Sequence, residues 1–404
     1  MDEQGQPHPK QPIPRFWLTL AILLLFCAVL KLPTLTAPHD EPDEQIYWQL
    51  ANRLLTVGQY NLQGTEILKR LSPPIYDNPV FCHPPLFAAL LIPFVHWQAR
   101  HLAVLVSWLG HFLCIMAVAV MGRRMARPGQ CQLIFWLPVL GMALDPFLTF
   151  LSGKLWIDSL LAGLCAASIA FFFCARYSER RALYLLTGSL LFGLAGLAKL
   201  PALALAPVVV LLILTPEVKT PSAWRDLVLG CLPALILVLP WFIYFHHTYG
   251  VFLPGWTRPD EWTMQRYPMV RTAVERSPFY YIGNMAAVEP VSILCLVAYI
   301  FNGSLWKRMD SALPGLWFLV VFTALSWVGL RGQGFQMRFL APLFPSIYLM
   351  LYALPGDWRN GRGVLPVIIL LCLIYAGLNG AFYLVMPQYD EISPVFTVWG
   401  QANL

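Results

Sequence analysis

Apolar runs of membrane-spanning length recur along most of the chain, and short polar connections separate them. A helix of about 20 apolar residues crosses the hydrocarbon core of a bilayer. The pattern predicts about eleven crossings, at residues 16–35, 101–121, 131–151, 158–175, 182–198, 201–215, 226–245, 283–301, 313–330, 339–355 and 363–384. The expected fold is therefore an all-α polytopic membrane protein, a bundle of about 11 transmembrane helices.

One long polar stretch, residues 36–100, interrupts this pattern after the first crossing. Within it, Ile46 and Leu50 begin an apolar face at helical spacing, and Gly58 is placed to end that helix. A second apolar run, 84–97, has roughly 14 residues, which is short for a crossing. We expect an outer first loop that carries surface helices, with the run 84–97 on the membrane surface or half inserted.

Composition supports the membrane assignment. The chain is 58% hydrophobic and 12% charged, with a mean hydropathy of +0.61, which excludes an ordinary soluble globular protein. No connection is long enough for a separate soluble domain, so we expect a cytoplasmic tail (1–15), an integral-membrane domain (16–384) and an outer C-terminal tail (385–404). The first span has no obvious small-residue cleavage site after it, and we expect an uncleaved anchor.

Basic residues set the expected orientation. They cluster in alternate short connections: Lys10/Arg15, Arg123/Arg124/Arg127, Arg176/Arg180/Arg181, Lys219/Arg225, Lys307/Arg308 and Arg359/Arg362. The positive-inside rule places these connections on the cytoplasmic side, and it explains the net charge of +6 better than nucleic-acid binding does. The other loops then face outward and bring acidic, basic and histidine side chains to one face of the membrane, where we expect the functional site.

Four carboxylates fall within five positions at the start of the first-loop helix, Asp40-Glu41-Pro42-Asp43-Glu44. Carboxylates beside a membrane span are costly to hold without a function. Asp43 is the candidate general base for an attacking hydroxyl or amine, and Glu44 is a second candidate catalytic carboxylate. Helix capping is the alternative, and it explains Asp40 better than it explains the whole cluster.

Three further positions at the outer face are candidates, each with a structural alternative. Asp158 either assists catalysis, holding a divalent metal cation with Asp43, or caps the helix that it begins. His83 precedes two prolines that fix its backbone, and it either binds substrate phosphate or metal or is an ordinary interfacial histidine. Lys199 ends a Gly-rich apolar run, and it either holds a lipid phosphate or extends to the membrane surface.

Two arginines in an outward connection, Arg331 and Arg338, break the positive-inside trend. An anionic partner explains such a position, because the planar guanidinium forms two parallel hydrogen bonds to a phosphate. Arg338 is therefore a candidate substrate-binding residue. Arg331 is either a second one or a surface arginine.

Taken in order, these motifs resemble those of the GT-C superfamily of membrane glycosyltransferases, above all the dolichyl-phosphate-mannose protein mannosyltransferases and the lipid A aminoarabinose transferases. The first family motif corresponds to Asp43-Glu44, Tyr47, Ala51, Leu54, Leu55, Gly58 and Tyr60. The later ones correspond to the segment from His83 to Leu86, Asp158, Lys199, Pro240-Trp241 and Arg338-Phe339. The resemblance covers about residues 16–354.

The resemblance implies a GT-C-like bundle with an outward site that moves a hexosyl or pentosyl unit from a polyprenyl-phosphate donor to a lipid, glycan or protein acceptor. It implies Asp43 as the base, with Tyr47 and Tyr60 among the substrate-binding residues. The neighbouring acids Asp40 and Glu41 leave the choice of base open, and metal dependence varies within the superfamily. The expected location is a bacterial inner membrane, or the endoplasmic reticulum membrane in a eukaryote, with membrane lipids as further partners.

A transporter or flippase of a lipid-linked anionic substrate is the alternative from another class. Such proteins typically show internal repeats, broken helices near the membrane midplane and charges along a transport path. The sequence shows no internal repeat, and we expect no broken helix and charges at one membrane face. These expectations favour the transferase.

Overall fold

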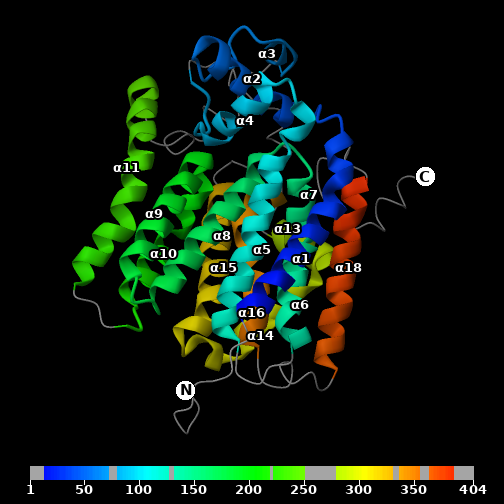
Figure 1. The fold of residues 1–404 in the computed structure, drawn as a ribbon, viewed down its shortest axis with the longest axis vertical. Coiled ribbons are helices and arrows are strands. Elements are labelled where there is room, and N and C mark those ends of the chain that lie inside the picture. The colour runs from blue at the N-terminus through cyan, green and yellow to red at the C-terminus, as the bar shows by residue number, and fades with distance from the viewer. Residues whose placement is uncertain are drawn as a thin grey trace.

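The computed structural model describes residues 13–71, 80–126, 132–218, 222–250, 279–330, 336–354 and 364–385, and the regular elements within these ranges are helices. Figure 1 shows a bundle of helices with α2, α3 and α4 above one end. The helices are α1 Ile13–Lys31, α2 Pro42–Val57, α3 Glu66–Leu71, α4 Leu86–His96, α5 Leu105–Met125, α6 Gln132–Ala143, α7 Pro146–Ser152, α8 Ile157–Ala175, α9 Arg181–Ala198, α10 Ala206–Leu214, α11 Ala223–Tyr249, α13 Phe279–Val288, α14 Pro290–Phe301, α15 Met309–Val328, α16 Phe344–Ala353 and α18 Leu365–Val385. Short 3₁₀ segments include η3 Arg100–Leu102, η4 Leu200–Leu205 and η8 Met337–Leu343.

The described residues contain seven helices that are long and apolar enough to cross a membrane, and two bent helix pairs raise the number to nine if each pair is one span. The predicted crossings at 201–215 and 339–355 correspond to shorter apolar segments, Leu200–Leu214 and Met337–Ala353. All the predicted runs are thus helical where they are described, and the polytopic all-α fold is confirmed. The count of eleven crossings is not confirmed, because proline and polar residues break several of the runs.

The first loop carries surface helices, as predicted. Helix α2 begins at a capping box in which the Glu41 side chain caps the helix and the Glu44 side chain accepts from the Glu41 N–H at 3.2 Å. It ends at Gly58, whose φ of 66° lies in the left-handed region that glycine adopts without strain. Its apolar face, with Ile46 and Leu50 buried, packs on α4, which spans the short run predicted at 84–97.

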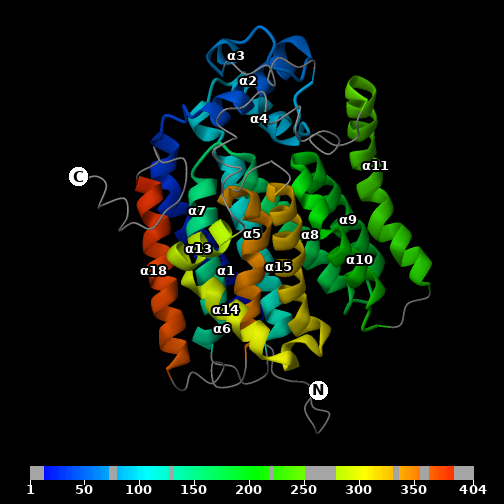
Figure 2. The same ribbon diagram turned by 180° about the vertical axis from the view of Figure 1, so that it is seen from behind.

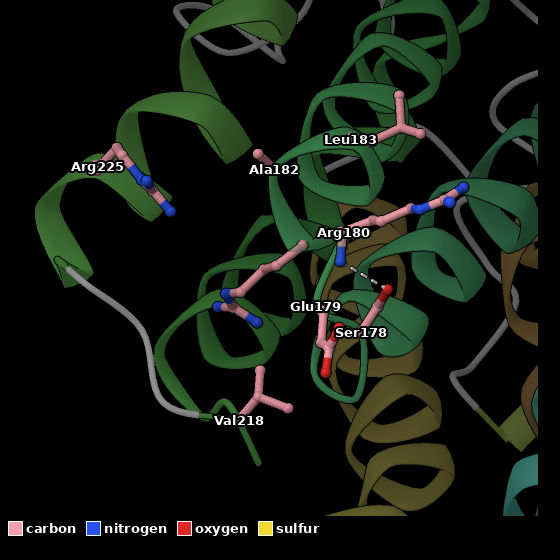
Figure 3. A pocket seen from close by; sticks show the side chains of 8 residues that line it. Ser178, Glu179, Arg180, Ala182, Leu183, Val218 and Arg225 are labelled. Carbon is pink, nitrogen blue, oxygen red and sulfur yellow. Dashed lines mark hydrogen bonds between the residues drawn. The ribbon is translucent and has the colours of Figure 1, made fainter.

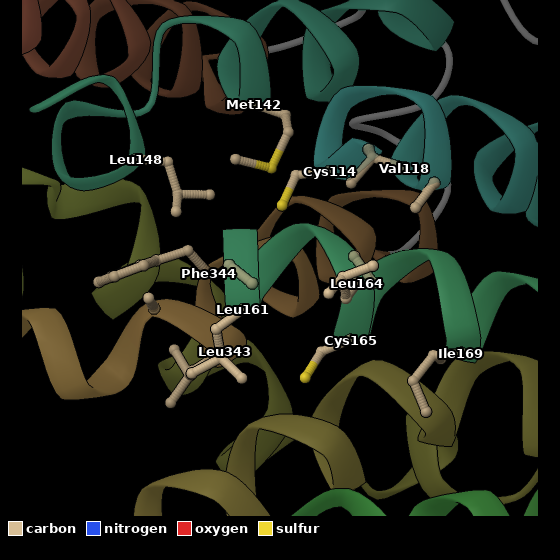
Figure 4. Close-up of a cluster of buried hydrophobic side chains, with 14 of the residues drawn as sticks. Cys114, Val118, Met142, Leu148, Leu161, Leu164, Cys165, Ile169, Leu343 and Phe344 are labelled. Carbon is tan, nitrogen blue, oxygen red and sulfur yellow. The ribbon is translucent and has the colours of Figure 1, made fainter. Parts of the chain in front are cut away.

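Helices α5 and α8 cross so closely that only glycine fits at the contact. A Cβ atom on Gly163 would lie 2.2 Å from the Gly110 carbonyl oxygen, and one on Gly110 would lie 2.1 Å from the Ser159 carbonyl oxygen. The hydroxyl of Ser159 also donates to the Ser107 carbonyl at 2.7 Å. Figure 4 shows part of the buried cluster around this crossing, to which both helices contribute. The crossing fixes the start of α8, where Asp158 lies.

Two broken spans place carboxyl groups inside the bundle, which corrects the expectation that helices are unbroken and that charges gather at one membrane face. Asp145 lies at the 40° bend between α6 and α7, and Glu289 lies at the 118° bend between α13 and α14. The Asp145 carboxylate accepts from the Leu148 N–H at 2.6 Å and from the Tyr348 hydroxyl at 2.9 Å. Both carboxyl oxygens of Glu289 are buried, and its carboxyl group neighbours Asp145 and Tyr348. Helices α13 and α14 contact α18 (Figure 2).

The opposite end of the bundle is held by ion pairs between basic and acidic side chains. Arg176 pairs with Asp310 at 2.6 Å and with Glu217 at 2.7 Å, and Arg181 pairs with Asp226 at 2.7 Å. Both arginines come from connections that the positive-inside rule places in the cytoplasm. They therefore bind helix ends together in addition to carrying the orienting charge.

Candidate active site

Each of the four carboxylates at the start of α2 contacts a basic side chain. The pairs are Asp40 with Arg100 at 3.3 Å, Glu41 with Lys154, Asp43 with Arg338, and Glu44 with His39 at 2.8 Å. The basic partners come from η3, from the connection before α8, from η8 and from the connection before α2. The start of α2 is therefore a point where segments distant in sequence converge above the bundle (Figure 1).

Glu44 is buried, with 3% of its side chain exposed, and its oxygens are occupied by hydrogen bonds. One oxygen accepts from the Leu155 N–H at 2.7 Å and contacts His39, and the other accepts from the Glu41 N–H. These bonds fasten α2 to the connection before α8. The predicted catalytic role of Glu44 stays a prediction, and the geometry favours a positioning role.

Asp43 and Arg338 form an ion pair at the edge of the site, with 32% and 23% of their side chains exposed. The Arg338 Nε donates to the Gln336 side-chain oxygen at 2.7 Å. Its guanidinium carbon also lies 4.8 Å from the centre of the Trp156 ring and 5.8 Å from that of Phe339. Arg338 is thus fixed from several sides, and Asp43 approaches it from α2.

Asp158 and Lys199 form a second ion pair, at 2.7 Å, with 2% and 7% of their side chains exposed. The Lys199 Nζ lies 5.0 Å from the centre of the Phe339 ring, which also neighbours Arg338. The two pairs are therefore adjacent. We call the four residues Asp43, Arg338, Asp158 and Lys199 the charge cluster; they come from α2, η8, α8 and the α9 terminus, and with ordinary charges they sum to zero.

The cluster determines the charge of its neighbours. Burial acts to raise the pKa of Asp43, but the positive charges of Arg338 and Lys199 overcome this effect and hold that pKa below its usual range. Burial and the positive charge of Lys199 lower the pKa of His83 to about 3. At neutral pH Asp43 is consequently a carboxylate and His83 is a neutral imidazole. A neutral imidazole has no positive charge with which to bind a phosphate, and the predicted contact of His83 with substrate stays a prediction.

The two predicted tyrosines belong to the first loop, Tyr47 within α2 and Tyr60 just after it. Tyr47 is buried, with its ring edge-on to Phe87 at 5.0 Å, and burial raises the pKa of its hydroxyl well above the usual value. The Tyr60 hydroxyl donates to the Pro84 carbonyl at 3.1 Å. Both therefore support the segment that carries His83, and their contact with substrate stays a prediction. Arg331 lies outside the described residues, as do residues 1–12 and 386–404 of the two predicted tails.

A metal site at Asp43 and Asp158 does not fit the arrangement. Each carboxylate already pairs with a cation, so a divalent ion between them would lie against Arg338 and Lys199. Across the described ranges, no group of three or more His, Cys, Asp and Glu side chains is placed to hold a metal.

Trp156 and Lys154 also contact residues of the site, although the motifs assigned neither of them a role. The Trp156 ring contacts both Arg338 and the Lys154 ammonium, the latter at 5.0 Å, and its carbonyl accepts from the Ser107 hydroxyl at 2.9 Å. Its indole N–H is buried without a hydrogen-bond partner among the described residues. The position of Trp156 two residues before Asp158 could have indicated that it belongs to the site. Tryptophans are common at membrane interfaces, however, so that position alone does not predict a functional role.

A cavity of about 600 Å³ opens at the other end of the bundle, between the starts of α9 and α11 (Figure 3). Its lining includes Arg181, whose guanidinium is engaged by Asp226, and the exposed side chains of Arg180 and Arg225. Arg180 points away from Arg225 in this view. The cavity lies at the opposite end of the bundle from the charge cluster, and two arginines of its lining, Arg181 and Arg225, both pair with Asp226.

No protein-family model matches this sequence, and no curated protein matches it. Solved structures do match its fold. ArnT from Cupriavidus metallidurans bound to undecaprenyl phosphate has a TM-score of 0.58 and 17% identity, over 92% of this chain and 69% of that one. ArnT in the apo state has a TM-score of 0.61 and 16% identity, over 93% and 76%.

A third solved structure, of a different protein, also matches the fold of this chain. The oligosaccharyltransferase of Archaeoglobus fulgidus, in a complex with Zn and sulfate, has a TM-score of 0.52 and 15% identity, over 95% of this chain and 54% of that one. The chain has the GT-C fold. The charge cluster includes Asp43 at the start of α2, which lies with α3 and α4 above one end of the bundle (Figure 1). The likeness to these solved structures confirms the fold that the motifs predicted.

Proposed function

We propose that this protein is a membrane glycosyltransferase that moves a sugar from a polyprenyl-phosphate donor to a lipid, glycan or protein acceptor at the outer membrane face. The observation that carries the proposal is the convergence of Asp43, Arg338, Asp158 and Lys199, from four distant segments, at one end of a GT-C bundle. The binding of undecaprenyl phosphate by ArnT, whose fold this chain shares, supports a polyprenyl-phosphate ligand.

The chemistry follows from the charges. Asp43 takes the proton of an acceptor hydroxyl or amine as that group attacks the anomeric carbon of the donor sugar. The bond between that carbon and the phosphate oxygen breaks, and its electron pair goes to the phosphate. Arg338, fixed by its neutral neighbours, stabilises the negative charge that grows there, while Lys199 contributes a buried positive charge nearby. Attack opposite the leaving group inverts the anomeric centre.

The test is the release of free polyprenyl phosphate. Purified protein is incubated with a mixture of polyprenyl-phosphate sugars and candidate acceptors, and lipid products are separated by chromatography and mass spectrometry. We expect release by the parent protein and its loss in Asp43→Asn. Asp40→Asn is the matched control, because its side chain is 66% exposed and pairs with Arg100. Equal release by Asp43→Asn and the parent would exclude Asp43 as the base.

A transporter of a lipid-linked anion is a second candidate, because the broken spans at Asp145 and Glu289 are a feature of transporters. A transporter would bind the lipid but would release no polyprenyl phosphate in the same incubation. Movement of a fluorescent polyprenyl phosphate across the membrane of proteoliposomes would then identify a transporter.

The proposed location of the protein is the plasma membrane of a bacterium.

A further inference from the structure

The two ion pairs of the charge cluster differ in how readily they can open. The pair Asp43–Arg338 is about a quarter to a third exposed, whereas the pair Asp158–Lys199 is nearly fully buried. A partly exposed pair contributes little net stability, but separating a buried pair leaves an uncompensated charge in a low-dielectric surrounding. The Asp43–Arg338 pair is therefore the one that a ligand can open.

Arg338 does not depend on Asp43 for its position. Its Nε is bonded to Gln336, and its guanidinium lies against the rings of Trp156 and Phe339. These neighbours are uncharged, so they orient the guanidinium without neutralising it. Among the described residues, Arg338 is in turn the side-chain hydrogen-bond partner of Asp43. A carboxylate that leaves Arg338 thus exposes a preorganised anion site and becomes free itself.

We infer that the donor phosphate takes the place of the Asp43 carboxylate on Arg338, so that donor binding itself releases Asp43 to act as the base. This inference rests on the proposed function and adds an order of events to it. A phosphate presents two oxygens to the planar guanidinium as a carboxylate does, and it carries at least as much negative charge. The Asp158–Lys199 pair stays closed, so Asp158 is a positioning residue and Arg338, not Lys199, binds the phosphate.

The exchange couples the two substrates of the reaction. Without donor, Asp43 is neutralised by Arg338 and is a weak base, consistent with a pKa held below its usual range. With donor, Asp43 loses that cation and gains an anionic neighbour, and both changes strengthen it as a base. The acceptor is therefore activated only when a donor is in place.

Binding of undecaprenyl phosphate tests the exchange, because this probe contains the phosphate and lacks any sugar. Its affinity is measured by native mass spectrometry or thermophoresis on detergent-purified protein at fixed ionic strength. We expect Asp43→Asn to bind roughly three- to tenfold more tightly than the parent, since the competing carboxylate has been removed from a partly exposed pair. Arg338→Gln should bind at least about tenfold more weakly.

The controls separate exchange from a general effect of charge. Asp40→Asn removes one negative charge from the same helix start without touching Arg338, and it should bind within about twofold of the parent. Asp158→Asn should not tighten binding. Asp43→Ser is a second variant in case Asp43→Asn is poorly folded, as judged by thermal unfolding.

The outcomes are distinguishable. If the parent binds the probe and neither Asp43 variant binds more tightly, or if Asp40→Asn tightens binding as much, the exchange is wrong and the transferase proposal survives. If the parent does not bind undecaprenyl phosphate at all, the proposed donor class itself is wrong.

Discussion

The buried Asp158–Lys199 pair permits a sharp test through Lys199→Met. This substitution keeps most of the apolar stem of the side chain and removes the ammonium 2.7 Å from the Asp158 carboxylate. Breaking a buried pair by removing one partner costs about 3–5 kcal/mol, because the other charge remains buried and uncompensated. The lost contact with the Phe339 ring, at 5.0 Å, adds roughly 0.5–1 kcal/mol.

The matched control is the double variant Asp158→Leu/Lys199→Met. Replacing both charges with apolar groups removes the uncompensated carboxylate, and such replacements are often neutral or stabilising. We therefore expect the double variant to recover most of the free energy of unfolding that the single variant loses. Because the charges of the site have changed, it should still transfer sugar more slowly than the parent.

Unfolding by SDS in mixed micelles, followed by circular dichroism, measures both variants. The expected order of stability is parent, then double variant, then Lys199→Met. If Lys199→Met were within about 1 kcal/mol of the parent, the pair would not be buried in the manner described. If the double variant were as unstable as the single one, packing of the lysine stem rather than charge pairing would explain the loss.

Three further predictions address the crossing, the histidine and the base. Gly163→Ala should destabilise the protein by about 1–3 kcal/mol in the same assay and slow transfer, since a Cβ atom would meet backbone at 2.2 Å, whereas Gly283→Ala, with nothing within 4 Å, should leave both unchanged. The pKa of His83 is about 3 in the folded state and near 6.5 in the unfolded chain, so the unfolded chain binds the proton first as the pH falls. The free energy of unfolding should therefore decrease between about pH 6.5 and pH 3. His83→Asn should remove this part of the pH dependence, and an unaltered profile in that variant would contradict the prediction. If donor phosphate displaces Asp43 from Arg338, the acid limb of kcat should lie at higher pH than that of kcat/KM, because Arg338 lowers the pKa of Asp43 in the free enzyme and no longer does so in the donor complex. Coincident limbs in steady-state pH profiles would argue against the exchange.

The sequence by itself determined the features that depend on neighbouring positions. Apolar run length gave the helical character of each predicted span, and the spacing of Ile46 and Leu50 with Gly58 gave the first-loop helix and its end. The shortness of the run 84–97 predicted a short helix there, and α4 is that helix. These signals are local, because helix periodicity, capping and span length involve residues a few positions apart.

Tertiary structure decided which charges meet. Asp43 and Arg338 are 295 positions apart in the sequence. No local pattern predicts that Arg338, the expected phosphate-binding residue, pairs with Asp43, the expected base, in the protein without ligand. No local pattern indicated that the Glu44 carboxylate would accept hydrogen bonds from backbone N–H groups, or that the Trp156 ring would lie against the Arg338 guanidinium. Partners across helices depend on packing that joins remote segments, so the sequence supplied the candidates and the fold assigned their contacts.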